Sequence, residues 1–410
     1  MGMKIHWAWV VLASSFVTLF VNYSIRIGAY SLLLPKMIED LQINLTQAGL
    51  IRGVYFFAYI LFSPLMGWLT DRIGGRWVIS FFCLFLGTGT FLMGRASNLH
   101  TAILYHGIMG IGAAAIWTPT ITLIQKWFGT TRRGMALGIL SPSYAMGFGL
   151  MGLILPLIIE YESWRMGWFF LGISGWGLVA LNGLFLKNSP EEVGLHPWGD
   201  AGKTVLPHSP QKVNFRSWDL LRMPSFWLIG ISYFFISIAA YMISDFIVVY
   251  GVMELKVNHA AASALITMMA LSGIVGGMVL MWLSDSIGRK KVLIMIHSLV
   301  AVSILWILLA REDLYFLRIG MGGFGFLYGA IWPMYGALTR DFFPEEVAGV
   351  AFGMMTIFYG IGAMVNPILA GIIVDLTGSF RWAFGAGILT SLAAGLAAIF
   401  LKNPLEQAGH

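Results

Sequence analysis

Long apolar runs separated by short polar segments make up most of this chain. A helix needs about 20 apolar residues to cross the hydrocarbon layer of a bilayer. The pattern predicts twelve such helices, at residues 7–34, 46–70, 77–95, 101–126, 135–159, 164–186, 226–252, 260–284, 291–310, 314–339, 349–374 and 381–401. No small-residue cleavage site follows the first run, so we expect a spanning helix there and not a removable signal peptide.

One long polar stretch, residues 187–225, interrupts this pattern midway. We interpret it as a cytoplasmic linker between an N-terminal six-helix bundle, residues 1–186, and a C-terminal six-helix bundle, residues 226–410. The predicted fold class is therefore all-α integral membrane, with twelve transmembrane helices in two bundles.

Composition supports a polytopic membrane protein. Of 410 residues, 58% are hydrophobic and 11% charged, whereas soluble domains carry about 25% charged residues. The only cysteine, Cys83, excludes an intrachain disulfide and a thiolate metal site. We expect no metal and no cofactor. The net charge of +6 comes from Lys and Arg in the short connecting segments, so we expect the lipid bilayer, and no nucleic acid, as the macromolecular environment.

The distribution of Lys and Arg predicts orientation, because cytoplasmic segments carry the excess of positive charge. Six of these residues lie in the odd-numbered connections, and sixteen lie in the termini, the linker and the even-numbered connections. Both termini and the linker are therefore expected in the cytoplasm, in an inner membrane of bacterial type. We expect a monomer.

The two halves repeat each other in sequence. Asp71 and Asp285 are 214 positions apart, and the pairs Trp117 with Trp332 and Tyr144 with Tyr359 are each 215 apart. The tripeptide SWR of the first half likewise recurs as SFR in the second. A near-constant offset indicates a duplicated six-helix unit, as found in many transporters.

The loop sequence GWLTDRIGGR (67–76), its weaker copy MWLSDSIGRK (281–290) and the two six-helix halves resemble the major facilitator superfamily of secondary transporters. The resemblance covers the whole chain. It implies two pseudo-symmetric bundles, transport by alternating access, and no enzymatic activity. It also implies a cytoplasmic gate formed by Asp71, Arg72, Arg76, Asp285 and Arg289. The alternative is that Asp71 and Arg72 only close a tight turn.

Some family motifs are altered here. Members often carry an Arg in the fourth span, where LYHGIMGIGAAA (104–115) has His106. The fifth span, GILSPSYAMGFGLMG (138–152), lacks the G-P-x-x-G-G order of antiporters, which favours symport or uniport. Finer similarity, in WAWVVL near the N-terminus and in TPTITLIQKWF (118–128), is to the branch of oxalate/formate and monocarboxylate carriers.

Three charges lie well inside predicted spans, at least six residues from either end: Arg26, Arg52 and Asp245. An Arg at mid-span costs about 2.5–3.5 kcal/mol on insertion scales, so such residues usually face a partner or a water-filled cavity. The family resemblance brings the first and seventh helices together on the outer side, so Arg26 and Asp245 are expected to meet there. Arg26 would bind a substrate anion and Asp245 would exchange a proton. The alternatives are a static ion pair, and an Arg52 that snorkels to the headgroups.

Aromatic residues at repeat-related positions are further candidates. Trp117, Trp332, Tyr144 and Tyr359 would form paired walls for a small organic substrate, although Trp and Tyr also serve simply as packing residues. Asn22 and Tyr30 share a helical face with Arg26 and would complete an anion site.

Two polar residues remain. Asn366 precedes Pro367 and is either a polar pore group or the mark of a kink. His106 is either a second proton-coupling group or a packing histidine.

The sequence contains no G-x-x-x-x-G-K-[ST] loop, so no nucleotide hydrolysis by that route is expected. The favoured function is secondary active transport of a small organic anion, a mono- or dicarboxylate, by proton symport. One alternative is a carrier of a neutral or cationic solute in which Arg26 and Asp245 are structural. Another is a non-transporting membrane sensor on the same fold.

Overall fold

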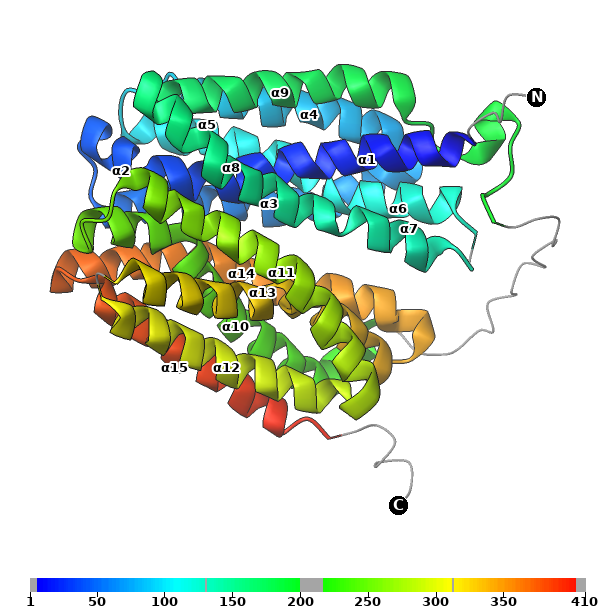
Figure 1. Cartoon of the computed structure of the whole chain (residues 1–410). Coiled ribbons are helices and arrows are strands. Elements are labelled where there is room, and N and C mark those ends of the chain that lie inside the picture. The colour runs from blue at the N-terminus through cyan, green and yellow to red at the C-terminus, as the bar shows by residue number, and fades with distance from the viewer. Residues whose placement is uncertain (1–5, 130, 200–216, 312, 403–410) are drawn as a thin grey trace. The chain divides into compact units, whose positions relative to one another are not determined.

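The computed structural model describes residues 6–129, 131–199, 217–311 and 313–402 (Figure 1). Over these ranges the chain is helical, with one isolated bridge between Phe128 and Trp198. Much of the predicted linker, including Lys203, Lys212 and Arg216, lies outside the described residues.

Twelve helical spans among the described residues are long and apolar enough to cross a membrane, which confirms the predicted number. They are Trp7–Leu41, Leu45–Ile73, Gly75–Met93, Leu99–Trp127, Arg133–Tyr161, Trp164–Phe185, Pro224–Glu254, His259–Ile287, Arg289–Ala310, Leu314–Phe342, Gly349–Thr377 and Phe380–Ile399. Most extend a few residues beyond the prediction, because the helices continue past the most apolar stretch.

Four of the spans are not continuous α-helices. The segments are α1 (Trp7–Tyr23), the π-helical η1 (Ser24–Ala29) and α2 (Tyr30–Leu41) in the first span, α5 (Leu99–Ala114) and α6 (Trp117–Trp127) in the fourth, α7 (Arg133–Leu140) and α8 (Pro142–Tyr161) in the fifth, and α10 (Pro224–Val249) with the π-helical η4 (Tyr250–Glu254) in the seventh. The remaining spans are formed by α3 (Leu45–Ile73), α4 (Gly75–Met93), α9 (Trp164–Phe185), α11 (His259–Ile287), α12 (Arg289–Ala310), α13 (Leu314–Phe342), α14 (Glu345–Thr377) and α15 (Phe380–Ile399).

Proline explains two of the breaks. Pro119 and Pro142 have no backbone N–H, so neither can bond to the carbonyl four residues earlier. The fourth span is broken at residues 115–116 and the fifth at Ser141. As a result Trp117 begins α6 and Tyr144 lies in the first turn of α8.

The chain forms two compact units. Unit 1 is Met1–Gln42 with Val54–Pro207, and unit 2 is Ile43–Gly53 with His208–His410. The division falls inside α3, so the first turns of that helix belong to unit 2.

Close packing on α14 places the start of α3 in unit 2. A Cβ on Gly49 would lie 2.1 Å from the carbonyl oxygen of Pro367, so only glycine permits this approach. The Asp375 carboxylate accepts hydrogen bonds from the backbone N–H groups of Leu45 (3.1 Å) and Thr46 (2.8 Å). A carboxylate at a helix N-terminus also interacts favourably with the helix dipole.

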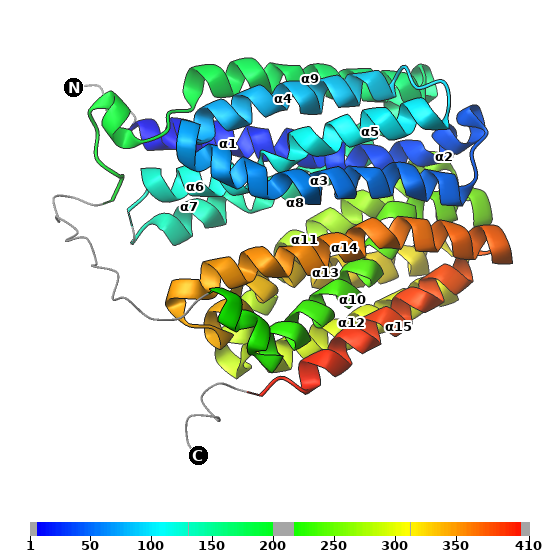
Figure 2. The same ribbon diagram turned by 180° about the vertical axis from the view of Figure 1, so that it is seen from behind.

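Within unit 1, α4 packs along α9, and α1 packs along α8 and α9 (Figures 1 and 2). Buried hydroxyl groups connect these helices. Thr18 donates to the Asn182 side chain (2.8 Å), and Ser24 donates to the Gly147 carbonyl (3.0 Å). The side chains on α1 and η1 are therefore fixed by two neighbouring helices.

The first part of the linker packs onto unit 1. The backbone N–H of Trp198 donates to the Trp127 carbonyl (2.9 Å), and the N–H of Gly129 donates to the Trp198 carbonyl (3.0 Å). The Trp198 ring lies 5.0 Å from that of Trp9. This docking was not predicted, because the segment is simply polar in sequence.

Each unit has an acidic side chain that bonds the start of an equivalent helix. In unit 1, Asp40 accepts a hydrogen bond from Arg165 (2.7 Å) at the start of α9. In unit 2, Glu254 accepts from the Ser379 hydroxyl (2.8 Å) and the Phe380 N–H (2.6 Å) at the start of α15. Asp40 and Glu254 are 214 positions apart. The recurring Ser-aromatic-Arg sequence thus bonds an acidic side chain in both units, through the Arg165 side chain in unit 1 and through Ser379 and the Phe380 N–H in unit 2.

The turn of the repeated loop motif requires glycine. Gly74 has φ of +85°, and its repeat mate Gly288 has φ of +98°. A Cβ on Gly74 would also lie 2.2 Å from Oδ1 of Asn188, which accepts the Arg76 N–H. We expect Gly74→Ala to destabilise the purified protein by about 1–3 kcal/mol, seen as a lower thermal midpoint.

Gly67→Ala is the matched control for this substitution. Gly67 lies inside α3, and nothing lies within 4 Å of a Cβ placed there. Alanine should leave the thermal midpoint unchanged or raise it, because it is the better helix former. Equal midpoints for the two variants would show that the strained turn at Gly74 does not matter for stability.

Candidate functional site

Arg26 lies in the middle of the π-helical segment η1 and is only 4% exposed. Its guanidinium carbon is 4.9 Å from the ring centre of Tyr59, 5.5 Å from that of Phe56 and 5.6 Å from that of Tyr23. Cation–π contacts of a desolvated arginine contribute about 2 kcal/mol. Single-turn π-helical segments within α-helices are frequently found at functional sites. Aromatic faces from α1 and α3 therefore hold this charge.

The two residues expected beside Arg26 lie in different segments. Asn22 is buried in the last turn of α1, and Tyr30 begins α2. A π-helix has more residues per turn than an α-helix, so positions four apart no longer stack directly above one another. The Tyr30 ring lies 5.3 Å from that of His106. A joint site of Asn22, Tyr30 and Arg26 remains a prediction.

His106 is completely buried on α5 among aromatic rings. Its ring centre lies 5.3 Å from Tyr30, 5.4 Å from Tyr55 and 6.1 Å from Trp168. This environment suits a packing histidine, and the structure does not test the proton-coupling role.

Unit 1 contains a group of three aromatic residues that we call the first triad: Tyr23, Trp117 and Tyr144. The Tyr23 ring lies 6.3 Å from Trp117 at an interplanar angle of 85°, and 5.6 Å from Tyr144 at 56°. The breaks before α6 and α8 place Trp117 and Tyr144 near helix starts. Because Tyr23 also contacts Arg26, the first triad and the charge form one cluster.

Unit 2 contains the second triad: Tyr241, Trp332 and Tyr359. The Tyr241 ring lies 6.5 Å from Trp332 at 72°, and 5.9 Å from Tyr359 at 49°. These values are close to those of the first triad, so the internal repeat reproduces the geometry in each unit. In the second triad the hydroxyl groups of Tyr241 and Tyr359 are also hydrogen-bonded to each other.

The central tyrosine of each triad was not predicted. Tyr23 and Tyr241 are 218 positions apart, whereas the other repeated residues are 214 to 216 apart. Allowing the offset to vary along the first helix of each half would have revealed the pair.

Asn366 braces α10 beside the second triad. With its amide oriented to satisfy both groups, it donates to the Ile238 carbonyl (3.2 Å) and accepts from the Met242 N–H (3.1 Å). These backbone groups lie three residues before and one residue after Tyr241. The side chain therefore supports the position of Tyr241, which neither of the two interpretations from the sequence had included.

Arg52 and Asp245 form a completely buried ion pair in unit 2. The guanidinium donates through Nε to Oδ2 (3.1 Å) and through Nη2 to Oδ1 (2.9 Å), and both side chains are 0% exposed. This bidentate geometry gives strong, charge-assisted hydrogen bonds between an arginine and a carboxylate.

One alternative from the sequence is corrected by this pair. Asp245 bonds Arg52 within unit 2, and the expected meeting of Arg26 and Asp245 remains a prediction. Arg52 does not snorkel to headgroups, because its side chain is fully buried. The physical reason is the close approach at Gly49, which packs the start of α3 on α14 within unit 2.

The repeated loop motifs differ in their contacts. In unit 2, Arg289 pairs with Asp285 (3.0 Å) and Asp341 (2.7 Å), joining α11, α12 and α13. In unit 1, Arg76 instead donates to the Gly183 carbonyl near the end of α9 (3.1 Å).

The neighbouring residues of the first motif lie at the surface. Asp71 is exposed, and Arg72 stacks on the ring of Trp68 at 4.4 Å. The role of these loops as a cytoplasmic gate remains a prediction.

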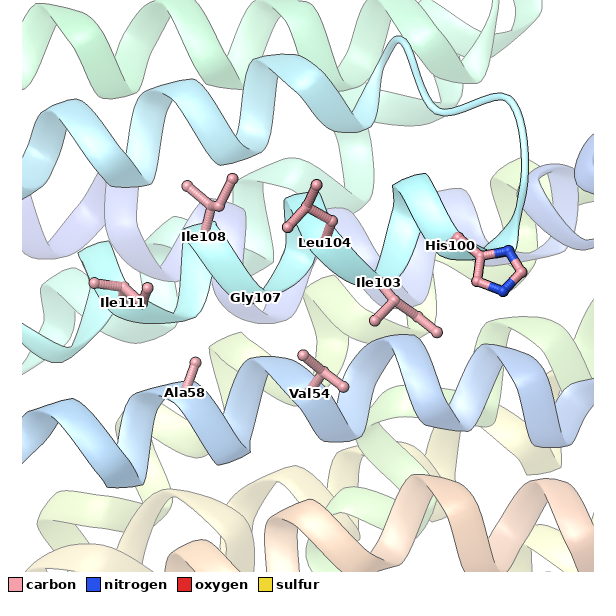
Figure 3. A pocket seen from close by; sticks show the side chains of 8 residues that line it. All are labelled: Val54, Ala58, His100, Ile103, Leu104, Gly107, Ile108 and Ile111. Atoms are coloured by element: carbon pink, nitrogen blue, oxygen red, sulfur yellow. The ribbon is translucent and has the colours of Figure 1, made fainter.

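An apolar groove of about 390 Å³ lies between α3 and α5 in unit 1 (Figure 3). Aliphatic side chains line it, with His100 at one end; the lining residues are Val54, Ala58, His100, Ile103, Leu104, Gly107, Ile108 and Ile111. A groove of this chemistry gives an anion little to bind, so we do not place the substrate there. Among the described residues no three or more His, Cys, Asp or Glu side chains gather as a metal site.

Comparison with known proteins shows one family along the chain. Residues 12–324 and 252–409 match the Major Facilitator Superfamily. A probable hexose phosphate transport protein of Chlamydia pneumoniae is 23% identical, covering 98% of this chain and 92% of that protein. A probable sulfoacetate transporter of Cupriavidus necator is 24% identical, covering 95% and 94%.

A membrane sensor protein of Salmonella typhimurium is 21% identical, over 94% of this chain and 89% of the sensor. Among solved structures, an inward-facing, unoccupied bacterial homologue of the human lysosomal transporter Spinster matches with a TM-score of 0.69. That match is 16% identical and covers 97% of this chain and 96% of the other. At this identity it shows the fold alone.

Proposed function

We propose that this chain carries a small organic anion across the membrane. The chain belongs to the Major Facilitator Superfamily and is a secondary transporter with no enzymatic activity. Arg26 binds the anionic end of the substrate. The two triads supply aromatic contact surface, and transport proceeds by alternating access. The chain acts as a monomer.

The observation that carries this proposal is the setting of Arg26. A guanidinium that is 4% exposed, in a π-helical segment and among three aromatic rings, costs free energy to bury in a membrane span. A charge kept at such cost is best explained by a role in binding. Arginine is also the residue best suited to planar anions, because it offers two parallel hydrogen bonds.

The relatives support an organic anion as the substrate, and they do not restrict it to a carboxylate. Two of them are named as probable transporters of hexose phosphate and of sulfoacetate, and both substrates are organic anions. A guanidinium binds phosphate, sulfonate and carboxylate by the same geometry. A mono- or dicarboxylate remains our first proposal for this chain. An organic phosphate or an organic sulfonate is the second.

Counterflow in proteoliposomes tests the function directly. Vesicles containing the purified protein are loaded with unlabelled lactate, sulfoacetate or glucose 6-phosphate and given the same labelled compound outside. At least one anion should accumulate label well above protein-free vesicles, while glucose and ethanolamine should not. Exchange of only glucose or ethanolamine would favour the carrier of a neutral or cationic solute.

We further propose that transport is coupled to protons. Asp245 and His106 are the groups that the sequence analysis proposed for this role. A proton on Asp245 would displace one of its two hydrogen bonds from Arg52, so proton uptake there requires the pair to rearrange. His106 would have to open its aromatic surroundings.

A second candidate function is sensing, because one relative is a membrane sensor protein aligned over most of this chain. A sensor would bind its ligand and would not exchange it across the bilayer. Binding of one of the three anions to the purified protein, without counterflow in proteoliposomes, would favour the sensor.

We propose an inner-membrane location with both termini in the cytoplasm, based on the sixteen to six division of positive residues. A reporter that works only in the cytoplasm should be active when fused at the C-terminus. A reporter that works only outside the cytoplasm should be active when inserted at Asn98. The opposite pattern would overturn the orientation.

A further inference from the structure

A buried histidine that the sequence analysis did not consider, His297 on α12, joins a hydrogen-bonded chain inside unit 2. Its Nε2 lies 3.2 Å from the Tyr335 hydroxyl oxygen, which lies 2.6 Å from Oγ of Ser232. Ser232 in turn donates to the Ala394 carbonyl (2.9 Å). His297, Tyr335 and Ser232 are all completely buried.

Counting the protons along this hydrogen-bonded series assigns the protonation state of the His297 imidazole. Ser232 has one hydroxyl proton, and it is used on the Ala394 carbonyl. The bond between Ser232 and Tyr335 must then use the Tyr335 proton, so the Tyr335 oxygen is left as an acceptor. Three bonds are satisfied at once only if His297 carries its proton on Nε2.

The other ring nitrogen, Nδ1, is therefore a bare lone pair. It has no hydrogen-bond partner among the described residues, although the side chain is fully buried. An orphaned buried nitrogen costs free energy, about 1–3 kcal/mol.

We propose that Nδ1 of His297 is the proton-accepting group of this transporter, with Tyr335 and Ser232 as positioning residues that fix its tautomer. On loading, one proton adds to Nδ1 and gives the imidazolium, while the Nε2 proton stays on its hydrogen bond to Tyr335. On release the same proton leaves Nδ1. This inference rests on the proton symport proposed above.

Among the described residues, no Asp or Glu side chain is hydrogen-bonded or ion-paired to His297, whose Nε2 meets the Tyr335 hydroxyl. Tyr335 from α13 and Tyr233 from α10, which stack at 4.0 Å, are the titratable groups on this side. From α15 the neighbours are Ser391, which donates to the His297 carbonyl (2.7 Å), and Gly395.

Charged residues on the helices packed around His297 lie well away along the sequence. Those closest in sequence to the residues around His297 are Lys291 on α12 itself and Arg340 and Asp341 on α13, with Asp245 on α10 and Arg381 on α15; α11 carries His259 and Asp285 at its ends. A rise of about 1.5 Å per residue puts Lys291 roughly 9 Å along the helix from His297.

The hydrogen-bonded series at His297 lies next to a ring that contacts the second triad. The Tyr233 ring, stacked on Tyr335, lies 5.1 Å from the ring of Tyr359. A shift of Tyr359 when substrate arrives would therefore be transmitted through Tyr233 to the partner of His297. This gives a packed connection between a proposed substrate contact and the proposed proton site.

The test compares His297→Gln with wild type in proteoliposomes, using whichever of lactate, sulfoacetate and glucose 6-phosphate shows counterflow. Glutamine keeps an amide donor near Nε2 but cannot take up a proton. We expect counterflow within about threefold of wild type, loss of at least tenfold in accumulation driven by a pH gradient, and no substrate-linked signal from a pH dye trapped in the vesicles. Tyr335→Phe should shift the pH profile of uptake without abolishing coupling.

Two controls separate coupling from structure. Ser391→Ala removes a hydrogen bond to the His297 backbone and should lower the thermal midpoint while keeping the ratio of protons to substrate. His100→Gln removes an unrelated histidine and should keep both. If wild type couples protons and His297→Gln does so equally, this inference is wrong and the proposed symport stands. If wild type moves no protons with substrate, symport and this inference fall together.

Discussion

Asp245→Asn and Arg52→Gln should each destabilise the protein by about 3–5 kcal/mol, because each leaves one member of a completely buried pair without its counter-charge. Replacing both should restore most of that loss, since two neutral amides need no counter-ion. The measurement is the thermal midpoint of the detergent-purified protein for wild type, the two single variants and the double variant.

An exposed ion pair serves as the control. Lys36 and Glu39 are also 2.9 Å apart, but their side chains are 47% and 71% exposed. Glu39→Gln should change the midpoint hardly at all, because exposed pairs contribute little to stability. Single Arg52 and Asp245 variants as stable as Glu39→Gln would contradict the buried pair.

The double variant also tests function. If Arg52→Gln/Asp245→Asn folds and still accumulates substrate against a gradient, the proton passes elsewhere and the pair is structural. The proton site inferred at His297 requires that result. Loss of proton-driven accumulation with normal counterflow would return the role to Asp245.

Arg26→Gln should lower counterflow of the transported anion at least a hundredfold, because the anion loses its charged partner in a site shielded from water. Arg26→Lys should weaken it less, since an ammonium keeps the charge but lacks the two-pronged geometry. Uptake rates in proteoliposomes, with the amount of folded protein matched between variants, measure both effects.

Arg318→Gln is the matched control for Arg26, because Arg318 is an exposed arginine on α13. Its uptake should equal that of wild type. If Arg26→Gln transports as well as Arg318→Gln, Arg26 is structural and the carrier of a neutral or cationic solute becomes the better proposal.

The spans and the repeat could be predicted from sequence because each follows a simple physical rule. A bilayer of fixed thickness sets the length of every apolar run. A duplicated unit reuses its contacts, which is why Asp40 and Glu254 bond the starts of equivalent helices and why Trp117 and Trp332 occupy equivalent triads.

The partners of the buried charges could not be predicted in the same way. Arg52 meets Asp245 because Gly49 packs directly on the Pro367 carbonyl, and such an approach depends on tertiary packing and leaves no periodic signal. The π-helical turn around Arg26 changes the residues that share its face, which an α-helical projection cannot show. His297 escaped notice because one histidine in an apolar run looks like any packing residue.

Isothermal titration of the purified protein with lactate, sulfoacetate and glucose 6-phosphate, with glucose as the uncharged comparison, tests most directly whether Arg26 binds an organic anion. The account predicts that wild type and Arg318→Gln bind at least one anion with equal affinity and do not bind glucose, and that a folded Arg26→Gln protein binds none of them. Undiminished binding of that anion by a folded Arg26→Gln protein would contradict it.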